Sequence, residues 1–174
     1  TVPAAIFGPL LKGVFEELLG NAHGVAFLLI VTAGLLVLGE RFTGKSKRGL
    51  GNLTWIDAVV IGLFQALAIL PGISRSGSTV SAGLLRGLER PAAARFSFLM
   101  AVPVMLGAGS VAGWELLLSE ELTEHIVVIL VGVLVSTVVG FLSIQWLISY
   151  LTRHSFKWFA IYCSAVGLAF LMSS

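Results

Sequence analysis

Charged residues are scarce in this sequence of 174 residues: Lys, Arg, Asp and Glu together make up 11%, against about 25% in a typical soluble domain. Hydrophobic residues make up 57% of the chain, and the mean hydropathy is +0.99. The net charge of +2 is too small to indicate a nucleic-acid partner. We therefore predict an all-α integral membrane protein, with residues 1–174 forming one domain of transmembrane helices in contact with the lipid bilayer.

Cysteine is nearly absent, since Cys163 is the single one and lies in an apolar run. A lone cysteine excludes an internal disulfide framework and a cluster of metal-binding cysteines. We expect its thiol to act as a small buried hydrophobic group. The first apolar run begins abruptly at Thr1 and is shorter than the ~20 residues that a membrane span needs, so we expect an N-terminal truncation.

Apolar runs alternate with charged connections along the chain. The runs cover residues 25–39, 57–88, 92–118, 126–151 and 159–172. Basic clusters follow the first, second and fourth runs (Arg41, Lys45, Lys47, Arg48; Arg86, Arg90, Arg95; Arg153, His154, Lys157), and an acidic group follows the third (Glu120, Glu121, Glu124). Because Lys and Arg mark the cytoplasmic side, the second run should enter and leave the membrane on that side. This predicts a re-entrant hairpin of two half-helices over residues 57–88.

Residues that start or break helices predict several helix ends. Pro71 should end the first half-helix at Leu70, and Ser78 or Thr79 should cap the second. Residues 1–19 should form the end of a helix followed by an acidic turn at Glu16 and Glu17, and residues 21–24 should form a break. Four further polar residues should have no role in a site: Asp57 and Glu89 at the interfacial ends of the hairpin, and His125 and His154 in solvated loops.

The hairpin tip, residues 70–79, is polar and rich in hydrogen-bond donors. Within six residues, Ser74, Ser76, Ser78 and Thr79 supply four hydroxyls and Arg75 supplies a guanidinium. The N-terminus of the second half-helix adds a partial positive charge, and Arg suits bidentate contacts with phosphate. The tip lacks the Lys and the spacing of a nucleotide P-loop, so a lipid phosphate fits better than ATP or GTP. The alternative is a plain connection between helices, with an arginine that reaches the membrane surface.

The segment Pro71-Gly72-Ile73-Ser74-Arg75-Ser76-Gly77-Ser78-Thr79 resembles the PGxSRSxxT signature of the undecaprenyl-diphosphate phosphatases, the bacitracin-resistance family. Residues 62–68 and 86–98 resemble the segments that flank this signature. The resemblance implies a multi-pass hydrolase of the bacterial inner membrane, built from two inverted repeats, with an active site open to the periplasm. Such an enzyme removes the terminal phosphate of undecaprenyl diphosphate, which recycles the lipid carrier for peptidoglycan, supports cell shape and confers bacitracin resistance.

The resemblance also implies roles for individual residues. The catalytic group would comprise Ser74, Arg75 and Thr79, with Arg75 clamping the diphosphate and Ser74 acting as the nucleophile or positioning it. Substrate binding would involve Gln65, Gly72, Ser76, Gly77 and Ser78. Gln65 would orient a phosphate or a metal-bound water, or else would be an amide that packs between helices. Attack by serine and attack by an activated water both remain open.

Parts of the family pattern are missing from this chain. We find no second copy of the hairpin, no matching E/QxxxE glutamate pair and no Ser-rich loop that ends in Gly-His, so the chain resembles about the last two-thirds of a family member. A divalent cation, Mg or Ca, is implied by the resemblance alone, because no residues here form a cluster of metal ligands. Two other readings stay open, a lipid-phosphate transporter or flippase and a non-catalytic remnant with a phosphate-binding loop. A homodimer is also left open.

Overall fold

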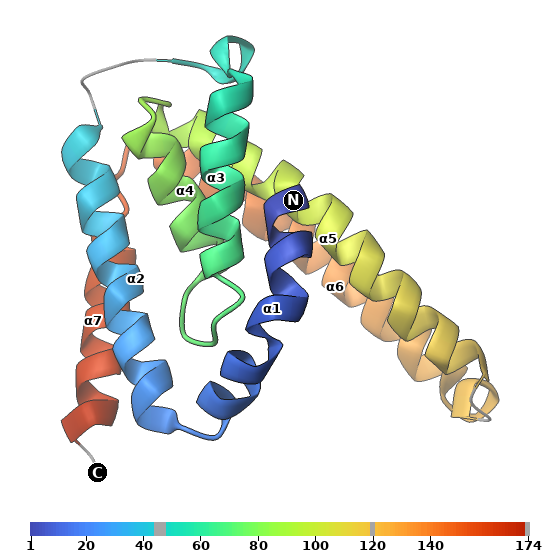
Figure 1. Ribbon diagram of the computed structural model, residues 1–174. Coiled ribbons are helices and arrows are strands. Elements are labelled where there is room, and N and C mark those ends of the chain that lie inside the picture. The colour runs from blue at the N-terminus through green and yellow to red at the C-terminus, as the bar shows by residue number, and fades with distance from the viewer. Residues whose placement is uncertain (44–47, 119–120, 173–174) are drawn as a thin grey trace.

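The computed structural model describes residues 1–43, 48–118 and 121–172, apart from the side chains of residues 9, 12 and 121–125 (Figure 1). These ranges contain seven α-helices, one 3-10 helix and no strand. The helices are α1 (Val2–Leu19), α2 (Ala22–Phe42), η1 (Leu50–Asn52), α3 (Trp55–Leu67), α4 (Arg75–Leu85), α5 (Arg90–Leu118), α6 (Glu121–Leu151) and α7 (Lys157–Met172). The predicted all-helical class is confirmed.

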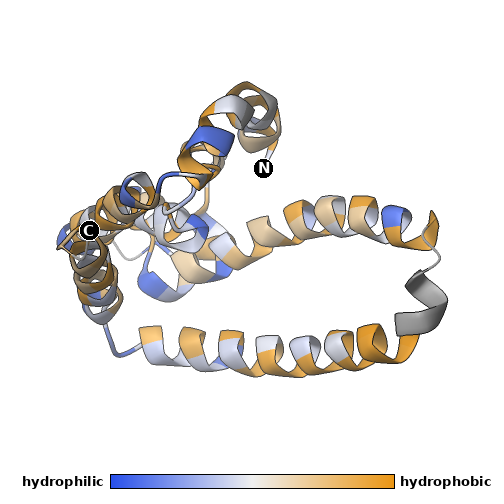
Figure 2. Ribbon diagram, turned by 90° about the horizontal axis from the view of Figure 1, so that it is seen from below, coloured by the Kyte–Doolittle hydropathy of each residue, from blue (hydrophilic) through white to orange (hydrophobic). Residues whose placement is uncertain are grey.

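Three of the helices are long and apolar enough to cross a membrane: α2, α5 and residues Ile126–Leu151 of α6. Helices α5 and α6 form a long arm that leaves the rest of the bundle (Figure 1). Hydrophobic residues run along most of this arm, whereas hydrophilic residues gather in the bundle (Figure 2). Exposed apolar side chains over such lengths are suited to contact with lipid, so the chain is a membrane protein of helical type.

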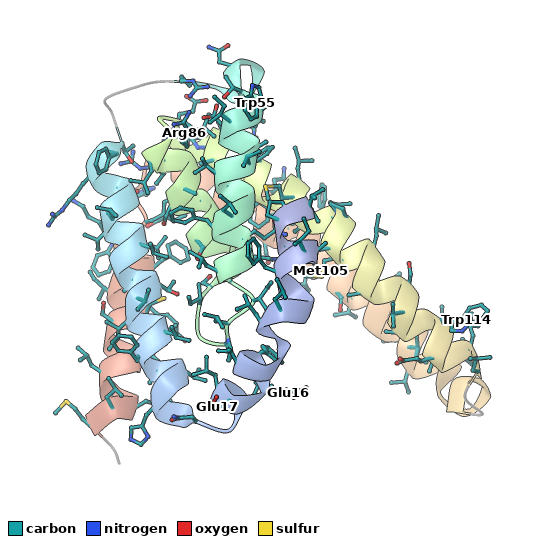
Figure 3. The ribbon with its side chains drawn as sticks, viewed as in Figure 1. Glu16, Glu17, Trp55, Arg86, Met105 and Trp114 are labelled. Carbon is teal, nitrogen blue, oxygen red and sulfur yellow. The ribbon has the colours of Figure 1, made fainter. Side chains whose placement is uncertain are left out.

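Helices α3 and α4 form a hairpin in which the connecting residues 68–74 lie in the middle of the molecule (Figure 1). The start of α3 at Trp55 and the end of α4 at Arg86 lie at the same end of the bundle (Figure 3). The expected helix–loop–helix geometry is therefore present. That the hairpin re-enters the membrane remains a prediction.

Local interactions explain where the two half-helices begin. The Thr54 side chain accepts a hydrogen bond from the Asp57 N–H (3.3 Å), and the Asp57 carboxylate accepts one from the Thr54 N–H (2.9 Å), which forms a capping box. Helix α4 is capped by Ser74, whose Oγ accepts from the Gly77 N–H at 3.2 Å. The predicted cap at Ser78 or Thr79 is wrong, because the helix already starts at Arg75.

The loop between these helices requires glycine at one position. Gly72 has a φ of +95°, and a Cβ there would clash with the backbone oxygen of Val25 on α2. The predicted helix end at Leu70 is also wrong, because α3 ends at Leu67 and residues 68–70 form successive turns before Pro71. The chain thus reverses over a short distance and brings its backbone directly against α2.

The N-terminal predictions need a similar correction. Residues 2–19 form one continuous helix, and Glu16 and Glu17 belong to its last turns instead of forming an acidic turn. The predicted break at residues 21–24 shortens to the α1–α2 junction, because Asn21 caps α2 by accepting a hydrogen bond from the Gly24 N–H (3.1 Å). In the third connection, Glu121 and Glu124 belong to α6 instead of a loop. Glu120 lies outside the described residues.

Helix α4 occupies the centre of the bundle, where it packs against α2, α3 and α5. Every residue from 77 to 84 is buried. Small residues allow this packing: a Cβ at Gly77 would meet Thr32 of α2 at 3.1 Å, and a Cβ at Gly83 would meet Ala93 of α5 at 2.9 Å. Helix α4 is therefore held in place from three sides.

Candidate phosphate-binding site

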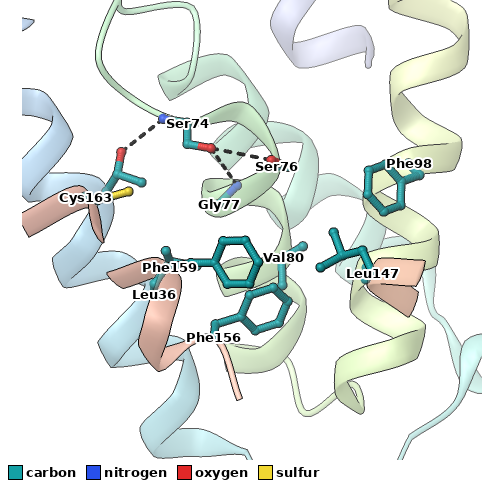
Figure 4. A pocket seen from close by; sticks show the side chains of 12 residues that line it. Leu36, Ser74, Ser76, Gly77, Val80, Phe98, Leu147, Phe156, Phe159 and Cys163 are labelled. Carbon is teal, nitrogen blue, oxygen red and sulfur yellow. Dashed lines mark hydrogen bonds between the residues drawn. The ribbon is translucent and has the colours of Figure 1, made fainter. Parts of the chain in front are cut away.

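The N-terminus of α4 gathers the polar groups of the hairpin tip. Ser74 and Ser76 lie close together, with 3.5 Å between their hydroxyl oxygens (Figure 4). The backbone N–H groups of Arg75 and Ser76 have no acceptor among the described residues, as is usual in the first turn of a helix. These N–H groups and the helix dipole favour an anion at this position.

Arg75 is the first residue of α4 and is half-buried. Within the described part of the chain, its guanidinium has neither an ion-pair partner nor a hydrogen-bond acceptor. The other buried or half-buried arginines near the hairpin, Arg48, Arg86 and Arg90, are all paired with carboxylates. Arg75 therefore keeps its charge available for an anionic ligand.

Thr32 on α2 holds the loop in position. Its Oγ1 accepts a hydrogen bond from the Ser74 N–H (3.0 Å) and lies 3.2 Å from the backbone oxygens of Gly72 and Leu28, to which the hydroxyl can donate. The side chain is fully buried. Thr32 was not predicted from the sequence, although a threonine within the apolar run of residues 25–39 is the kind of polar residue that can indicate such a contact.

A cavity of about 100 Å³ lies beside Ser74 and Ser76 (Figure 4). Its lining comprises Thr32, Leu36, Ser74, Ser76, Gly77, Val80, Ala94, Phe98, Leu147, Phe156, Phe159 and Cys163. The hydroxyl groups lie at the loop, and the aromatic and aliphatic side chains form the remaining wall. The cavity thus offers hydrogen-bond donors to a polar group and an apolar surface to a hydrocarbon chain.

Three predicted site residues lie beneath the tip instead of on this cavity. The Thr79 hydroxyl is 2.6 Å from Ser97 Oγ on α5 and can donate to the Arg75 backbone oxygen (2.9 Å). The Ser78 side chain is buried, and its Oγ has no hydrogen-bond partner among the described residues. Gln65 is buried in the last turn of α3. The structure thus brings Ser74, Arg75, Ser76 and Gly77 together at the tip, whereas Gln65, Gly72, Ser78 and Thr79 are not among the residues that line the cavity beside Ser74. Gly72 lines a different hollow, between α2 and α7.

The residues at the tip do not fit a divalent cation. Residues 68–79 include no carboxylate or imidazole, which are the side-chain ligands that Mg²⁺, Ca²⁺ and similar ions prefer. Over the described ranges, no group of three or more His, Cys, Asp or Glu side chains could hold a metal ion. We therefore assign no step of a reaction to a cation held by these residues.

Asp57 has a structural role that the sequence did not predict. It was expected to be interfacial, but its side chain is fully buried and accepts hydrogen bonds from Arg48 (2.6 Å) and Arg86 (2.7 Å). Burial alone raises the pKa of Asp57, but hydrogen bonds from Arg48, Thr54 and Arg86 outweigh it and hold the pKa well below its usual range. The cluster ties the two ends of the hairpin together, away from the tip.

Other polar residues support the bundle or face outward. Glu40 accepts hydrogen bonds from the Arg90 guanidinium (2.7 Å) and the Phe156 N–H (2.8 Å), which connects α2 with α5 and with the residue that precedes α7. Glu89 and His154 are exposed, and the His154 ring stacks on Tyr150. His125 belongs to α6 instead of the predicted loop, and its side chain lies outside the described part, as do residues Lys45 and Lys47. Cys163 is half-buried and lines the cavity.

Comparison with known proteins adds independent information. The family model described as "Bacitracin resistance protein BacA" matches residues 1–169. Proteins named undecaprenyl-diphosphatase are 43% identical in Desulforudis audaxviator, 41% in Corynebacterium glutamicum and 38% in Mycobacterium ulcerans; in each case the match covers 99% of this chain. It covers 64%, 59% and 63% of these relatives, respectively, so the chain spans about three-fifths of their length. From its sequence and the match over nearly its whole length, the chain belongs to the bacitracin resistance protein BacA family.

Proposed function

We propose that this chain takes part in the hydrolysis of undecaprenyl diphosphate to undecaprenyl phosphate and inorganic phosphate. The observation that carries the proposal is the unpaired Arg75 in the first turn of α4, between Ser74 and Ser76. These two serines line a cavity that has hydroxyls at one end and an apolar wall, although Arg75 itself is not among the lining residues. A lipid diphosphate has the matching chemistry, with a highly charged head and a hydrocarbon chain. The names of the relatives favour hydrolysis over the transport alternative.

In this proposal, the diphosphate lies against the first turn of α4. The Arg75 guanidinium and the free N–H groups of Arg75 and Ser76 bind phosphate oxygens and stabilise the charge that develops on the transferred phosphoryl group. The Ser76 hydroxyl donates a further hydrogen bond, and Gly77 leaves room for close approach. The first isoprene units of the lipid lie toward Phe98, Phe156 and Phe159.

Ser74 is the proposed nucleophile or the group that positions an attacking water. Its Oγ already accepts a hydrogen bond from the Gly77 N–H, which leaves the hydroxyl proton free to be donated. No carboxylate or imidazole among the described residues is hydrogen-bonded to this oxygen. Because a serine nucleophile needs a nearby base, we propose that the base comes from another part of the complete protein.

Gln65, Ser78 and Thr79 support the tip from below in this proposal. The Thr79 hydroxyl fixes the first turn of α4 against Ser97. We further propose that a divalent cation binds together with the diphosphate. We also propose that the protein lies in the bacterial inner membrane with its active site open to the periplasm, that it serves peptidoglycan synthesis and that it forms a homodimer.

Phosphate release by the complete protein in detergent or vesicles tests the proposal. Replacement Arg75→Ala should lower kcat/KM for undecaprenyl diphosphate by about 10²–10³-fold, the usual effect of removing a group that stabilises transition-state charge. Arg95→Ala is the matched control, because Arg95 is an exposed arginine on α5. Equal activity of the wild type and the Arg75 variant, with both proteins folded, would remove this site from the mechanism.

The two roles of Ser74 can be separated by acid quenching during turnover. A serine nucleophile should leave phosphoserine at position 74, detectable by mass spectrometry of the quenched protein. Activated water should leave none, and Ser74→Ala should then retain part of its activity.

A further inference from the structure

Helices α2 and α7 run side by side (Figure 1), and two hollows lie along their contact. The first has a volume of about 370 Å³ and is lined by Leu36, Val37, Glu40, Arg41, Arg90, Ser155, Lys157 and Ala160. The second has a volume of about 390 Å³ and is lined by Ile30, Ala33, Gly34, Val37, Leu38, Arg41 and Ser164. Because Val37 and Arg41 line both hollows, we treat them as one groove and call it the α2–α7 groove.

One end of the α2–α7 groove carries an excess of positive charge, because Arg41, Arg90 and Lys157 line it together with the single carboxylate of Glu40. Glu40 is already bound by the Arg90 guanidinium at 2.7 Å and the Phe156 N–H at 2.8 Å. Arg41 and Lys157 are exposed and form no ion pair with any described residue. Two cations and the Ser155 hydroxyl therefore face this hollow with their hydrogen-bonding capacity largely unused.

The rest of the groove is apolar and open. Ile30, Ala33, Val37 and Leu38 supply its aliphatic lining, with Val37 and Leu38 each 43% exposed. At Gly34, a Cβ would meet no atom within 4 Å, so the missing side chain leaves free space on the surface of α2. A hydrocarbon chain fits this part of the groove better than a polar ligand does.

The groove is separate from the phosphate site at the tip of the hairpin. Leu36 is the one described residue that lines both the cavity at Ser74 and the basic hollow, and it lies between them. The basic end of the groove lies with the ends of α2 and α7 that carry Arg41 and Lys157. A ligand there would not contact Ser74 or Arg75.

We propose that the α2–α7 groove binds an anionic phospholipid of the surrounding bilayer. Its phosphate lies between Arg41 and Lys157, and one acyl chain follows the apolar surface of α2. Two unpaired cations favour a lipid with net negative charge over a zwitterionic one, because the choline group of the latter would add a third positive charge. Basic pockets between membrane helices bind acidic headgroups for the same reason.

Native mass spectrometry of the complete protein can test this proposal by comparing phosphatidylglycerol and phosphatidylcholine with identical acyl chains. Phosphatidylglycerol should be retained at least about tenfold more tightly. The double replacement Arg41→Gln and Lys157→Gln should abolish this preference. The control Arg95→Gln and Arg153→Gln removes the same charge from two exposed arginines outside the groove and should preserve it. A loss of the preference in the control, or its survival in the groove variant, would overturn the proposal.

A second variant tests the contribution of the apolar part of the groove alone. Gly34→Leu fills the apolar part without altering charge, and the open surroundings of Gly34 should allow the protein to fold. It should weaken phosphatidylglycerol binding several-fold. Inorganic phosphate and glycerol 3-phosphate should not compete with the lipid at equal concentration. Full competition by either ion, or tighter retention of undecaprenyl phosphate than of phosphatidylglycerol, would show that the groove does not select a bilayer phospholipid.

Discussion

At the scale of single residues, Thr32 shows how the site depends on a side chain far from it in the sequence. Its hydroxyl contacts Ser74 and Gly72, which follow it by 42 and 40 residues. Loss of one buried hydrogen bond typically costs about 1 kcal/mol, and a donor left unsatisfied costs about 1–3 kcal/mol. The Ser74 N–H would be such a donor if Thr32 were replaced by an apolar residue.

We therefore expect Thr32→Val to lower the rate of phosphate release clearly while the thermal unfolding temperature changes little. The loop loses the hydrogen bond that positions it, whereas the volume of the side chain is kept. Thr32→Ser, which restores the hydroxyl, should recover most of the rate. Assays of phosphate release together with thermal unfolding would measure both effects. Thr137→Val is the matched control, since the Thr137 hydroxyl bonds only within exposed α6. A rate that falls equally for Thr32→Val and Thr32→Ser would contradict the anchoring role.

The sequence predicted which chemical groups lie at the tip, but it did not predict the contacts with other helices that hold the tip in place. The hydroxyls and the guanidinium of residues 74–76 follow from a local pattern, and the structure brings them together. Thr32 could not be predicted in the same way, because its role depends on a contact between segments that are distant in the chain. Thr79 and Ser78 share the local pattern, but helical geometry turns their side chains into the bundle.

At the scale of the helices, the two halves of the hairpin are joined at their base by Asp57. One carboxylate receives hydrogen bonds from Arg48, which precedes the hairpin, and from Arg86, which ends it. Because Asp57 is fully buried while both arginines are partly exposed, removal of its charge would leave two cations without their shared partner.

Asp57→Asn should lower the free energy of unfolding by about 1–3 kcal/mol, less than the full value for a completely buried pair because water screens the arginines. The pKa of Asp57 is depressed, so its contribution is fully present above the ordinary pKa of about 3.8 and is lost as the pH falls further, toward the lowered value of the folded state. Thermal unfolding between pH 5 and pH 8 should show a constant difference from the wild type, and this difference should shrink below pH 4. The control Glu89→Gln changes an exposed acidic residue nearby and should have little effect on the free energy of unfolding. If the difference between Asp57→Asn and the wild type depended on pH above pH 5, the contribution assigned to the Asp57 carboxylate would be wrong.

Helix ends were harder to predict than helices. The hairpin, α5 and α7 were expected from apolar runs and basic flanks, and each is present. The cap of α4 was placed four or five residues late because Ser74, Ser76, Ser78 and Thr79 are all reasonable caps by composition. Only the position of the Gly77 N–H relative to Ser74 Oγ distinguishes between them. The acidic turn at Glu16 and Glu17 was wrong because nothing before Gly20 interrupts the helix.

At the scale of the whole molecule, the charged groups divide between its two ends. Arg86 and Trp55 lie at one end, and Glu16 and Glu17 lie near the α1–α2 junction at the other (Figure 3). Both ends of the hairpin lie at the end of the bundle that carries Arg86. Because basic residues mark the cytoplasmic side, we predict that this end faces the cytoplasm.

Labelling of single cysteines in intact cells would test this orientation. In a Cys163→Ser background, Asn52→Cys and Glu89→Cys should react only after the membrane is made permeable, whereas Glu17→Cys should react from outside. All three residues are exposed, so reactivity should report on the side of the membrane. Opposite behaviour of Asn52→Cys and Glu89→Cys would mean that α3 and α4 do not form a re-entrant pair.

The close contacts around α4 have a consequence for how such a site can operate. With Gly77 against Thr32, Gly83 against Ala93 and Gly39 of α2 against Ser81, the helix has no room to slide or to rotate by one residue. The surrounding helices thus hold its first turn in one position. In the proposed reaction, the lipid headgroup is therefore the part that moves, because it must approach this fixed turn and leave it again.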